Sequence, residues 1–301
     1  LGCTCGVPVQ SHEEKGGRMM GGRSSSKTNL FLRYLFLVFI SVIASLPMLY
    51  MISTALKPNG ALYEYPPHFF PSPSKITLEN FRFILSESKF YINFLNSMVV
   101  SVSAVIISAI VSSALAFVLG VFDFKGKRVL FSFIIVTMII PGTALIIPQF
   151  ELAFKLKLIN KLLGLIPFYV AWVIPFSTFM IKGFMEDIPL DLIDAARIDG
   201  LDNFRIYLNV AFPLSIPAIA SVSIFNFLSS WEEYPWANTV INDNDLRTLP
   251  IAIAGFFGQH QFTQWGYVFA MSVLSLIPVV VLFVCFQRFF IAGLTSGSVK
   301  G

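Results

Sequence analysis

Charged side chains are scarce in this chain. Asp, Glu, Lys and Arg make up 13% of its 301 residues, and 55% of the residues are hydrophobic. Soluble domains contain about 25% charged residues, so this composition excludes an ordinary soluble globular domain. The mean hydropathy of +0.75 predicts an integral membrane protein. The basic residues form no stripe interleaved with exposed aromatic residues, which argues against a nucleic-acid-binding protein.

Cysteine is also scarce. Cys3, Cys5 and Cys285 are the three cysteines of the chain, too few to build a disulfide framework. The pair Cys3-Thr4-Cys5 has no further ligands at zinc-site spacing. We therefore expect neither a disulfide scaffold nor a metal site.

Catalytic motifs are missing as well. His12, His68 and His260 are dispersed, without the His-Glu-x-x-His spacing of a metalloprotease. Gly120–Lys127 is not a phosphate-binding loop, because five residues instead of four separate its glycines and Arg128 stands where Ser or Thr is needed. We expect no catalytic residue and no cofactor in this chain, so an intramembrane enzyme is disfavoured.

Long apolar stretches are abundant. Six of them have about the twenty residues that a membrane-spanning helix needs, near Leu30–Met51, Phe94–Phe122, Val129–Phe150, Leu162–Ile181, Val210–Trp231 and Gln264–Phe290. Most contain proline, which predicts kinks. The predicted fold class is an all-α integral membrane protein with six transmembrane helices. Ionisable residues are almost absent from the span interiors, which argues against a proton-coupled transporter.

Lys and Arg are more frequent on the N-terminal side of the predicted membrane. Lys125, Lys127 and Arg128 form a cluster on this side. Three lysines between spans three and four lie on the other side and reduce the difference in basic residues between the two sides. The positive-inside rule therefore predicts that both termini are cytoplasmic. Residues 1–28 are polar and rich in Gly and Ser, as expected for a disordered tail. Met19 and Met20 precede a basic run, which is compatible with a natural start there.

The segment Lys182–Asn209, between spans four and five, holds nine charged residues. Each would cost about 2.5–3.5 kcal/mol at the centre of a spanning helix, so we place the segment in the cytoplasm. A helix is predicted from Pro189 to a left-handed stop at Gly200. Its polar face consists of Asp191, Asp194 and Arg197, and Ala195 and Ala196 leave room for another backbone to approach.

This segment carries a motif. Asp194-Ala195-Ala196 is followed after three residues by Gly200, and after nine more by Val210-x-Phe212-Pro213. The pattern resembles the cytoplasmic-loop signature of permease subunits of binding-protein-dependent ATP-binding cassette (ABC) importers, Glu-Ala-Ala-x3-Gly-x9-Ile-x-Leu-Pro, with Asp in place of Glu. The segment Gln287–Gly301 resembles the tail of the smaller six-span permease of the maltose-type sugar importers.

The resemblance implies a type I ABC importer permease fold over 29–301, with a coupling loop at about 182–209 and a cytoplasmic tail at about 288–301. It also implies a second permease subunit, two ATPase subunits that hold ATP and Mg, an extracytoplasmic sugar-binding protein and a carbohydrate solute, in a bacterial or archaeal plasma membrane. The residues it assigns are Asp194, Ala195, Ala196, Gly200 and Pro213 for ATPase coupling, Gly293, Thr295 and Gly297 for the ATPase-contacting tail, and Gly258, Gln259, His260 and Gln261 for the binding-protein loop, within about Phe256–Gln264.

Other interpretations remain open at this stage. The loop helix could simply connect two spans, the outer loop could be an ordinary polar loop, and the tail could be a frayed end. An ATP-independent transporter or channel is the alternative function, and it should show internal repeats or buried ionisable residues. The sequence does not choose among oligosaccharides, monosaccharides, polyols and glycerophosphate compounds, nor does it assign substrate-binding residues.

Overall fold

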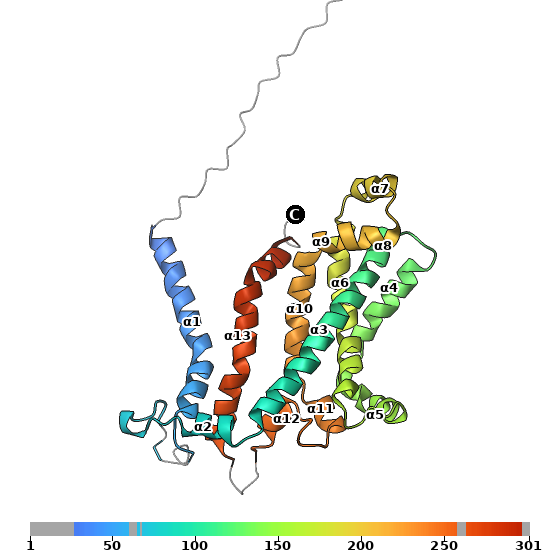
Figure 1. Ribbon diagram of the computed structural model, residues 1–301. Helices are drawn as coiled ribbons and strands as arrows, with labels where there is room; N and C mark the ends of the chain where they lie inside the picture. The colour runs from blue at the N-terminus through green and yellow to red at the C-terminus, as the bar shows by residue number, and fades with distance from the viewer. Residues whose placement is uncertain (1–26, 60–64, 67, 258–262, 297–301) are drawn as a thin grey trace, which may run out of the picture. The chain divides into compact units, whose positions relative to one another are not determined.

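The computed structural model describes residues 27–59, 65–66, 68–257 and 263–296 (Figure 1). The described elements are helices, and no β-strand occurs among them, which confirms the predicted all-α class. The chain divides into two units, residues 1–48 and residues 49–301. The first described helix, α1 (Lys27–Ala55), runs from the first unit into the second.

The remaining α-helices belong to the second unit. They are α2 (Glu79–Ser86), α3 (Phe90–Val121), α4 (Lys127–Val136), α5 (Ile146–Lys155), α6 (Ile166–Glu186), α7 (Leu190–Ile198), α8 (Asn203–Ile206), α9 (Phe212–Leu214), α10 (Ile216–Trp231), α11 (Pro235–Val240), α12 (Leu249–Ala254) and α13 (Trp265–Ser296). Short 3₁₀ turns occupy Pro73–Lys75, Thr137–Ile139, Gly142–Leu145 and Leu162–Gly164, and a π-helical turn occupies Tyr207–Ala211.

Four helical segments are long and apolar enough to cross a membrane: Asn29–Ala55, Phe90–Val121, Leu162–Glu186 and Trp265–Gln287. Two further spans are bent pairs. Lys127–Ile139 and Gly142–Lys155 meet at 93°, and Asn203–Leu214 and Ile216–Trp231 meet at 76°. Counting each pair as one span gives the predicted six. Prolines lie at both bends, where the missing N–H weakens the helical hydrogen-bond ladder.

The helices of the second unit pack most extensively where α3 meets α6, and α10 packs against α3, α6 and α13. Gly120 permits the close approach of α3 to α6, because a Cβ at this position would lie 2.8 Å from the Cβ of Met185.

A polar contact joins three helices in the interior. The Asn226 amide of α10 donates to Ser108 Oγ of α3 at 3.1 Å and to Ser177 Oγ of α6 at 3.0 Å.

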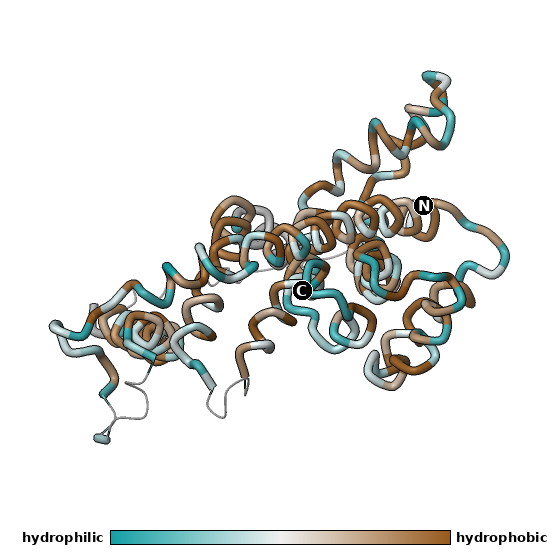
Figure 2. The backbone as a smooth tube through the Cα atoms, turned by 60° about the horizontal axis from the view of Figure 1, so that its bottom comes forward, coloured by the Kyte–Doolittle hydropathy of each residue, from teal (hydrophilic) through white to brown (hydrophobic). Residues whose placement is uncertain are grey.

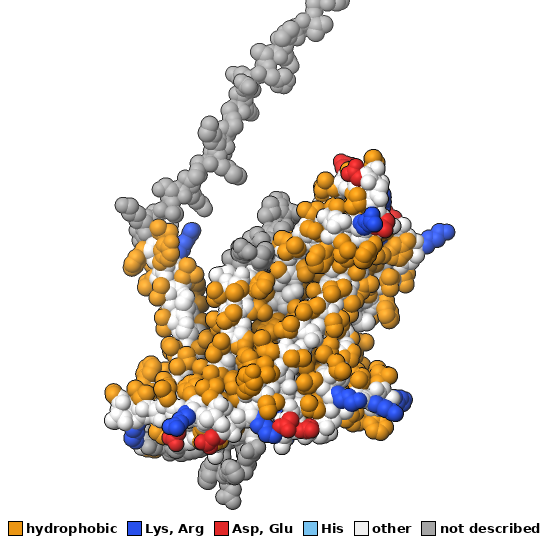
Figure 3. Space-filling model, in the orientation of Figure 1, with side chains coloured by type: hydrophobic (Ala, Val, Ile, Leu, Met, Phe, Trp, Pro, Cys, Tyr) orange, Lys and Arg blue, Asp and Glu red, His pale blue; other side chains and the backbone are white. Residues whose placement is uncertain are grey.

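Polar and apolar residues are segregated along the unit. Figure 2 shows hydrophobic residues along the long helices and hydrophilic residues mainly in the connections. On the face seen in Figure 3, hydrophobic side chains cover the middle of the helices, and charged side chains gather at the two ends. In Figure 1, α7 lies at one end of this unit and α2, α5, α11 and α12 lie at the other. This arrangement fits an apolar band in contact with lipid.

Candidate functional site

The loop helix α7 lies between the spans formed by α6 and α10. It begins after Pro189, carries Asp191 in its first turn and ends at Ile198. Gly200 follows with φ +85°. The Gly200 N–H donates to the Arg197 carbonyl and the Leu201 N–H to the Ala196 carbonyl, each at 3.0 Å. These two bonds form a Schellman motif, so the predicted helix and its glycine stop are confirmed.

One face of α7 is buried in the chain's own core. Ile193 and Ala196 are 1% and 8% exposed, and they belong to a hydrophobic cluster with residues of α3, α6 and the segment that leads into α10. Ile181 and Met185 of α6 are members of this cluster. Ala196 therefore packs inside the chain's own core, whereas Ala195 is exposed.

The opposite face of α7 combines acidic and apolar side chains. Asp194 is exposed, and it lies near Leu190 and Ile198, which are 63% and 86% exposed. Arg197 Nη1 donates to Asp194 Oδ1 at 3.1 Å, and the Arg197 guanidinium lies 5.8 Å from the Phe122 ring centre. An exposed ion pair of this kind contributes little stability. The face has the chemistry to dock in a groove of apolar and basic residues.

The rest of the motif lies along the segment that leads into α10. Asp202 caps α8 by accepting from the Arg205 N–H at 2.8 Å. The π-helical turn follows, and Tyr207 within it shares a 2.7 Å hydrogen bond with Ser113 of α3. Pro213 is exposed and lies two residues before the bend at Ser215. A proline removes one helical N–H, so the sequence contains a signal for irregularity here, although it did not predict a π-helical turn.

The structure describes only some of the other residues to which the resemblance assigns a role. Gly258, Gln259, His260 and Gln261 lie outside the described residues. Gly293 and Thr295 lie in the last turns of α13, which continues to Ser296, beyond the predicted end of span six. Gly297 lies outside the described residues. The segment interpreted as a tail is therefore helical for most of its length.

Two features at the other end of the unit were not predicted. Glu233 fixes α11, because its carboxylate accepts from the Trp236 N–H at 2.7 Å, the Ala237 N–H at 2.9 Å and the Tyr169 hydroxyl at 2.7 Å. An acidic residue just before Pro235 is a helix-start signal that could have been read from the sequence.

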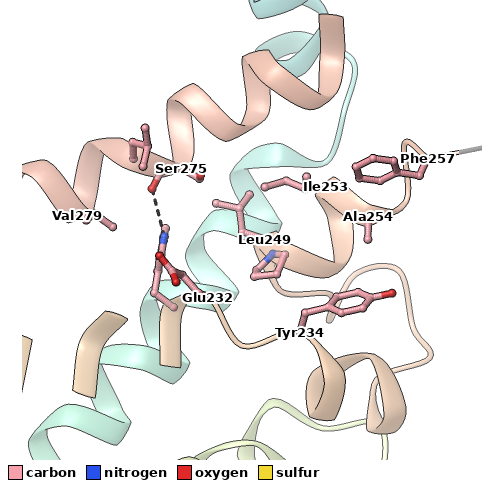
Figure 4. A pocket seen from close by; sticks show the side chains of 11 residues that line it. Glu232, Tyr234, Leu249, Ile253, Ala254, Phe257, Ser275 and Val279 are labelled. Carbon is pink, nitrogen blue, oxygen red and sulfur yellow. Dashed lines mark hydrogen bonds between the residues drawn. The ribbon is translucent and has the colours of Figure 1, made fainter. Parts of the chain in front are cut away.

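The second feature is a cavity of about 280 Å³ between the end of α10, α12 and α13 (Figure 4). Its walls include Trp231, Glu232, Tyr234, Phe257 and Ser275. Trp231, Glu232 and Tyr234 are close in sequence, but Phe257 and Ser275 come from later segments, and no local pattern brings the three segments together.

Comparisons with known proteins give a consistent result. Residues 112–296 match the family described as "Binding-protein-dependent transport system inner membrane component". The chain is similar to an arabinooligosaccharides transport system permease protein of Halalkalibacterium halodurans, with 36% identity over 91% of this chain and 99% of the relative. It is also similar to a diacetylchitobiose uptake system permease protein of Streptomyces coelicolor, with 32% identity over 85% and 91%. A trehalose/maltose transport system permease protein of Thermococcus litoralis is 30% identical over 88% and 94%.

A solved structure shares the fold. It is the crystal structure of a bacterial ABC transporter involved in the import of the acidic polysaccharide alginate. One of its chains superposes with a TM-score of 0.72 and 22% identity, over 90% of this chain and 99% of that chain. At this level of identity the comparison establishes the arrangement of helices and nothing about the solute.

Proposed function

Since this chain belongs to the family of binding-protein-dependent transport system inner membrane components, we propose that it is the permease subunit of an ATP-driven importer for a sugar. The predicted family and the type I ABC importer permease fold are confirmed. The matched relatives are transport permeases rather than enzymes. Arabinooligosaccharides, diacetylchitobiose and trehalose or maltose appear in the names of the three relatives, which supports a carbohydrate as the solute.

The observation that carries the coupling part of this proposal is the two-faced packing of α7. Its exposed face offers Asp194, Ala195 and Ile198 to a partner, and its buried face joins the core through Ile193 and Ala196. A helix that only linked two spans would not need an exposed apolar face. In the proposal, this face docks on one of two ATPase subunits, which hold ATP and Mg.

Movement of α7 would be transmitted to the membrane-spanning helices through direct side-chain contacts. Ile193 shares a cluster with Ile181 and Met185 of α6, and the Tyr207 hydroxyl contacts Ser113 of α3. Closure of the ATPase subunits on ATP would move α7 and tilt these helices. With a second permease subunit across the pathway, the tilt would alternate access between the two sides of the membrane.

The remaining contacts follow from the resemblance. The loop with Gly258, Gln259, His260 and Gln261 would enter an extracytoplasmic sugar-binding protein, and Gly293, Thr295 and Gly297 would reach the ATPase subunits. The chain is a multi-pass membrane protein by family and by its apolar helices. The distribution of Lys and Arg supports a plasma-membrane orientation with both termini cytoplasmic.

Co-purification from the native membrane tests this proposal. The unaltered chain should carry a P-loop ATPase and a second permease in fixed proportion. Ala195→Trp should remove the ATPase without preventing insertion, because Ala195 is exposed on the docking face and contributes nothing to the buried one. Arg205→Ala is the matched control, because Arg205 is exposed on the same loop and only its backbone N–H makes the α8 cap.

Two results would contradict the proposal. If the chain is recovered alone or as a homo-oligomer, under conditions that preserve a known importer, an ATP-independent transporter becomes the better hypothesis. If Ala195→Trp retains the ATPase as fully as Arg205→Ala does, the exposed face of α7 is not the docking surface.

A further inference from the structure

Two adjacent glutamates follow α10, and their surroundings differ. Glu233 is held by three hydrogen bonds that fix α11 to α6. Glu232 is exposed, and no described residue donates a hydrogen bond to its carboxylate or forms an ion pair with it. The Glu232 side chain lines the cavity instead (Figure 4). A carboxylate without an internal partner, at the edge of a cavity, is available to a ligand.

The cavity has a fixed shape. The Trp231 indole Nε1 donates to the Ser275 carbonyl at 3.2 Å, so the end of α10 is tied to α13. Figure 4 shows this bond beside the Glu232 side chain. Leu249 and Ile253 of α12 form the facing apolar wall. Because the walls come from packed helices, the cavity does not need a ligand in order to form.

The rings at this cavity are accessible. Tyr234 and Phe257 are 38% and 48% exposed, while Trp231 is 4% exposed and serves as a wall. Aromatic faces combined with a carboxylate acceptor match the chemistry of a sugar, which presents apolar C–H faces and hydroxyl donors. The volume of about 280 Å³ is at the lower end of small-molecule pockets, which suits a single sugar unit better than a whole oligosaccharide.

The position of the cavity relates it to delivery of the solute. Phe257 is the last described residue before 258–262, and the predicted binding-protein loop includes these positions. Phe257 itself belongs to the predicted loop of about Phe256–Gln264, so one wall of the cavity is part of the segment expected to meet the binding protein.

We propose, on the basis of the proposed function, that this cavity binds one sugar unit of the solute at the extracytoplasmic mouth of the pathway. Glu232 accepts sugar hydroxyl hydrogens there, and Tyr234 and Phe257 pack against the ring. The negative charge of Glu232 repels anionic sugars, because like charges at short range interact unfavourably. The site therefore favours neutral or cationic saccharide units.

The test uses the full importer in proteoliposomes, with its binding protein, ATPase subunits and second permease. Four radiolabelled probes are supplied in turn: arabinotriose, diacetylchitobiose, maltose and the anionic sulfoquinovosyl glycerol. Glu232→Ala should slow uptake of any neutral probe that is transported by about tenfold, the effect of losing hydrogen bonds to a charged acceptor. ATP hydrolysis stimulated by the binding protein should stay within about twofold of the unaltered complex, so the ratio of transport to hydrolysis falls.

Charge selectivity provides a second measurement. Glu232→Gln keeps the size of the side chain and removes its charge, so it should raise the uptake of sulfoquinovosyl glycerol relative to the neutral probes. Glu87→Gln is the matched control, because Glu87 is an exposed acid at the same end of the unit and outside the cavity. It should change neither uptake nor selectivity.

The outcomes separate this inference from the proposed function. If a neutral probe is transported and both Glu232→Ala and Tyr234→Ala leave its uptake unchanged, the cavity is not a sugar site, although the importer function stands. If the unaltered complex transports none of the four probes, this inference is overturned, whereas the importer function is decided separately by co-purification of the ATPase and the second permease.

Discussion

At the scale of single residues, two glycines are required for different reasons. Gly200 adopts φ +85° and has nothing within 4 Å of an added Cβ, so its backbone conformation is the constraint. Gly120 lies in a helix, and there the constraint is space, because Met185 is too close for a side chain. One glycine ends a helix and the other lets two helices meet.

Gly200→Val should therefore weaken coupling. A β-branched residue in the left-handed region costs about 1–2 kcal/mol, and the strain would loosen the Schellman end of α7. We expect ATP-driven uptake to fall several-fold while membrane insertion remains normal, measured as uptake per inserted protein. Gly200→Asn is the control, since Asn tolerates this conformation, and it should retain most of the uptake. Normal uptake in the Val variant would show that the rigid stop is not needed for coupling.

At the scale of elements, the contact between α3 and α6 organises the unit. These helices pack more extensively than any other pair, and the cluster that holds α7 lies at the end where Gly120 faces Met185. The close approach therefore positions both the two spans and the loop helix packed against them.

Gly120→Ala should push these two helices apart. The added Cβ would lie 2.8 Å from the Met185 Cβ, and overpacking of this kind costs about 1–3 kcal/mol. We expect a lower apparent melting temperature in detergent, measured by a thiol-independent aggregation assay. Gly183→Ala in α6 is the matched control, because nothing lies within 4 Å of a Cβ there. It should not lower the melting temperature, and equal losses in the two variants would contradict the spatial argument.

At the scale of the whole molecule, buried polar contacts connect segments that are distant in sequence. Asn226 bonds to Ser108 and Ser177, so one carboxamide links α3, α6 and α10. Interhelical hydrogen bonds in membranes contribute about 0.6 kcal/mol on average and up to about 1.7 kcal/mol. The contribution is modest, but it specifies how three spans meet.

Asn226→Leu should destabilise this three-helix junction. It leaves Ser108 and Ser177 without the amide and places a branched apolar side chain at a position that is 2% exposed. We expect a drop of several degrees in the apparent melting temperature, followed in detergent by circular dichroism. Ser272→Ala is the control, since the Ser272 hydroxyl donates to the Val268 carbonyl of its own helix. A melting temperature equal to that of the control would mean that packing alone holds the junction.

The sequence alone determined the features of the protein that depend on residues close to one another in the chain. Six apolar stretches, the charged segment between spans four and five, and the loop helix with its glycine stop at Gly200 follow from hydropathy, charge and backbone preference, which act within a few residues. The motif in that segment indicates the family through its residue types and their spacing. The bends of two spans were partly visible in their prolines, but the angles were not, because they depend on neighbouring helices.

Only the tertiary structure decided how adjacent residues of the same type differ in burial and in the contacts of their side chains. Ala196 faces the core and Ala195 faces outward; Glu233 fixes α11 while Glu232 lines a cavity. Adjacent residues share most of their local sequence context. Glu233 before Pro235 signals a helix start, but local preference does not decide which side chains each residue contacts. Their roles depend on side chains of α3, α6, α12 and α13 that approach from distant parts of the chain, and these contacts exist only once the helices have packed.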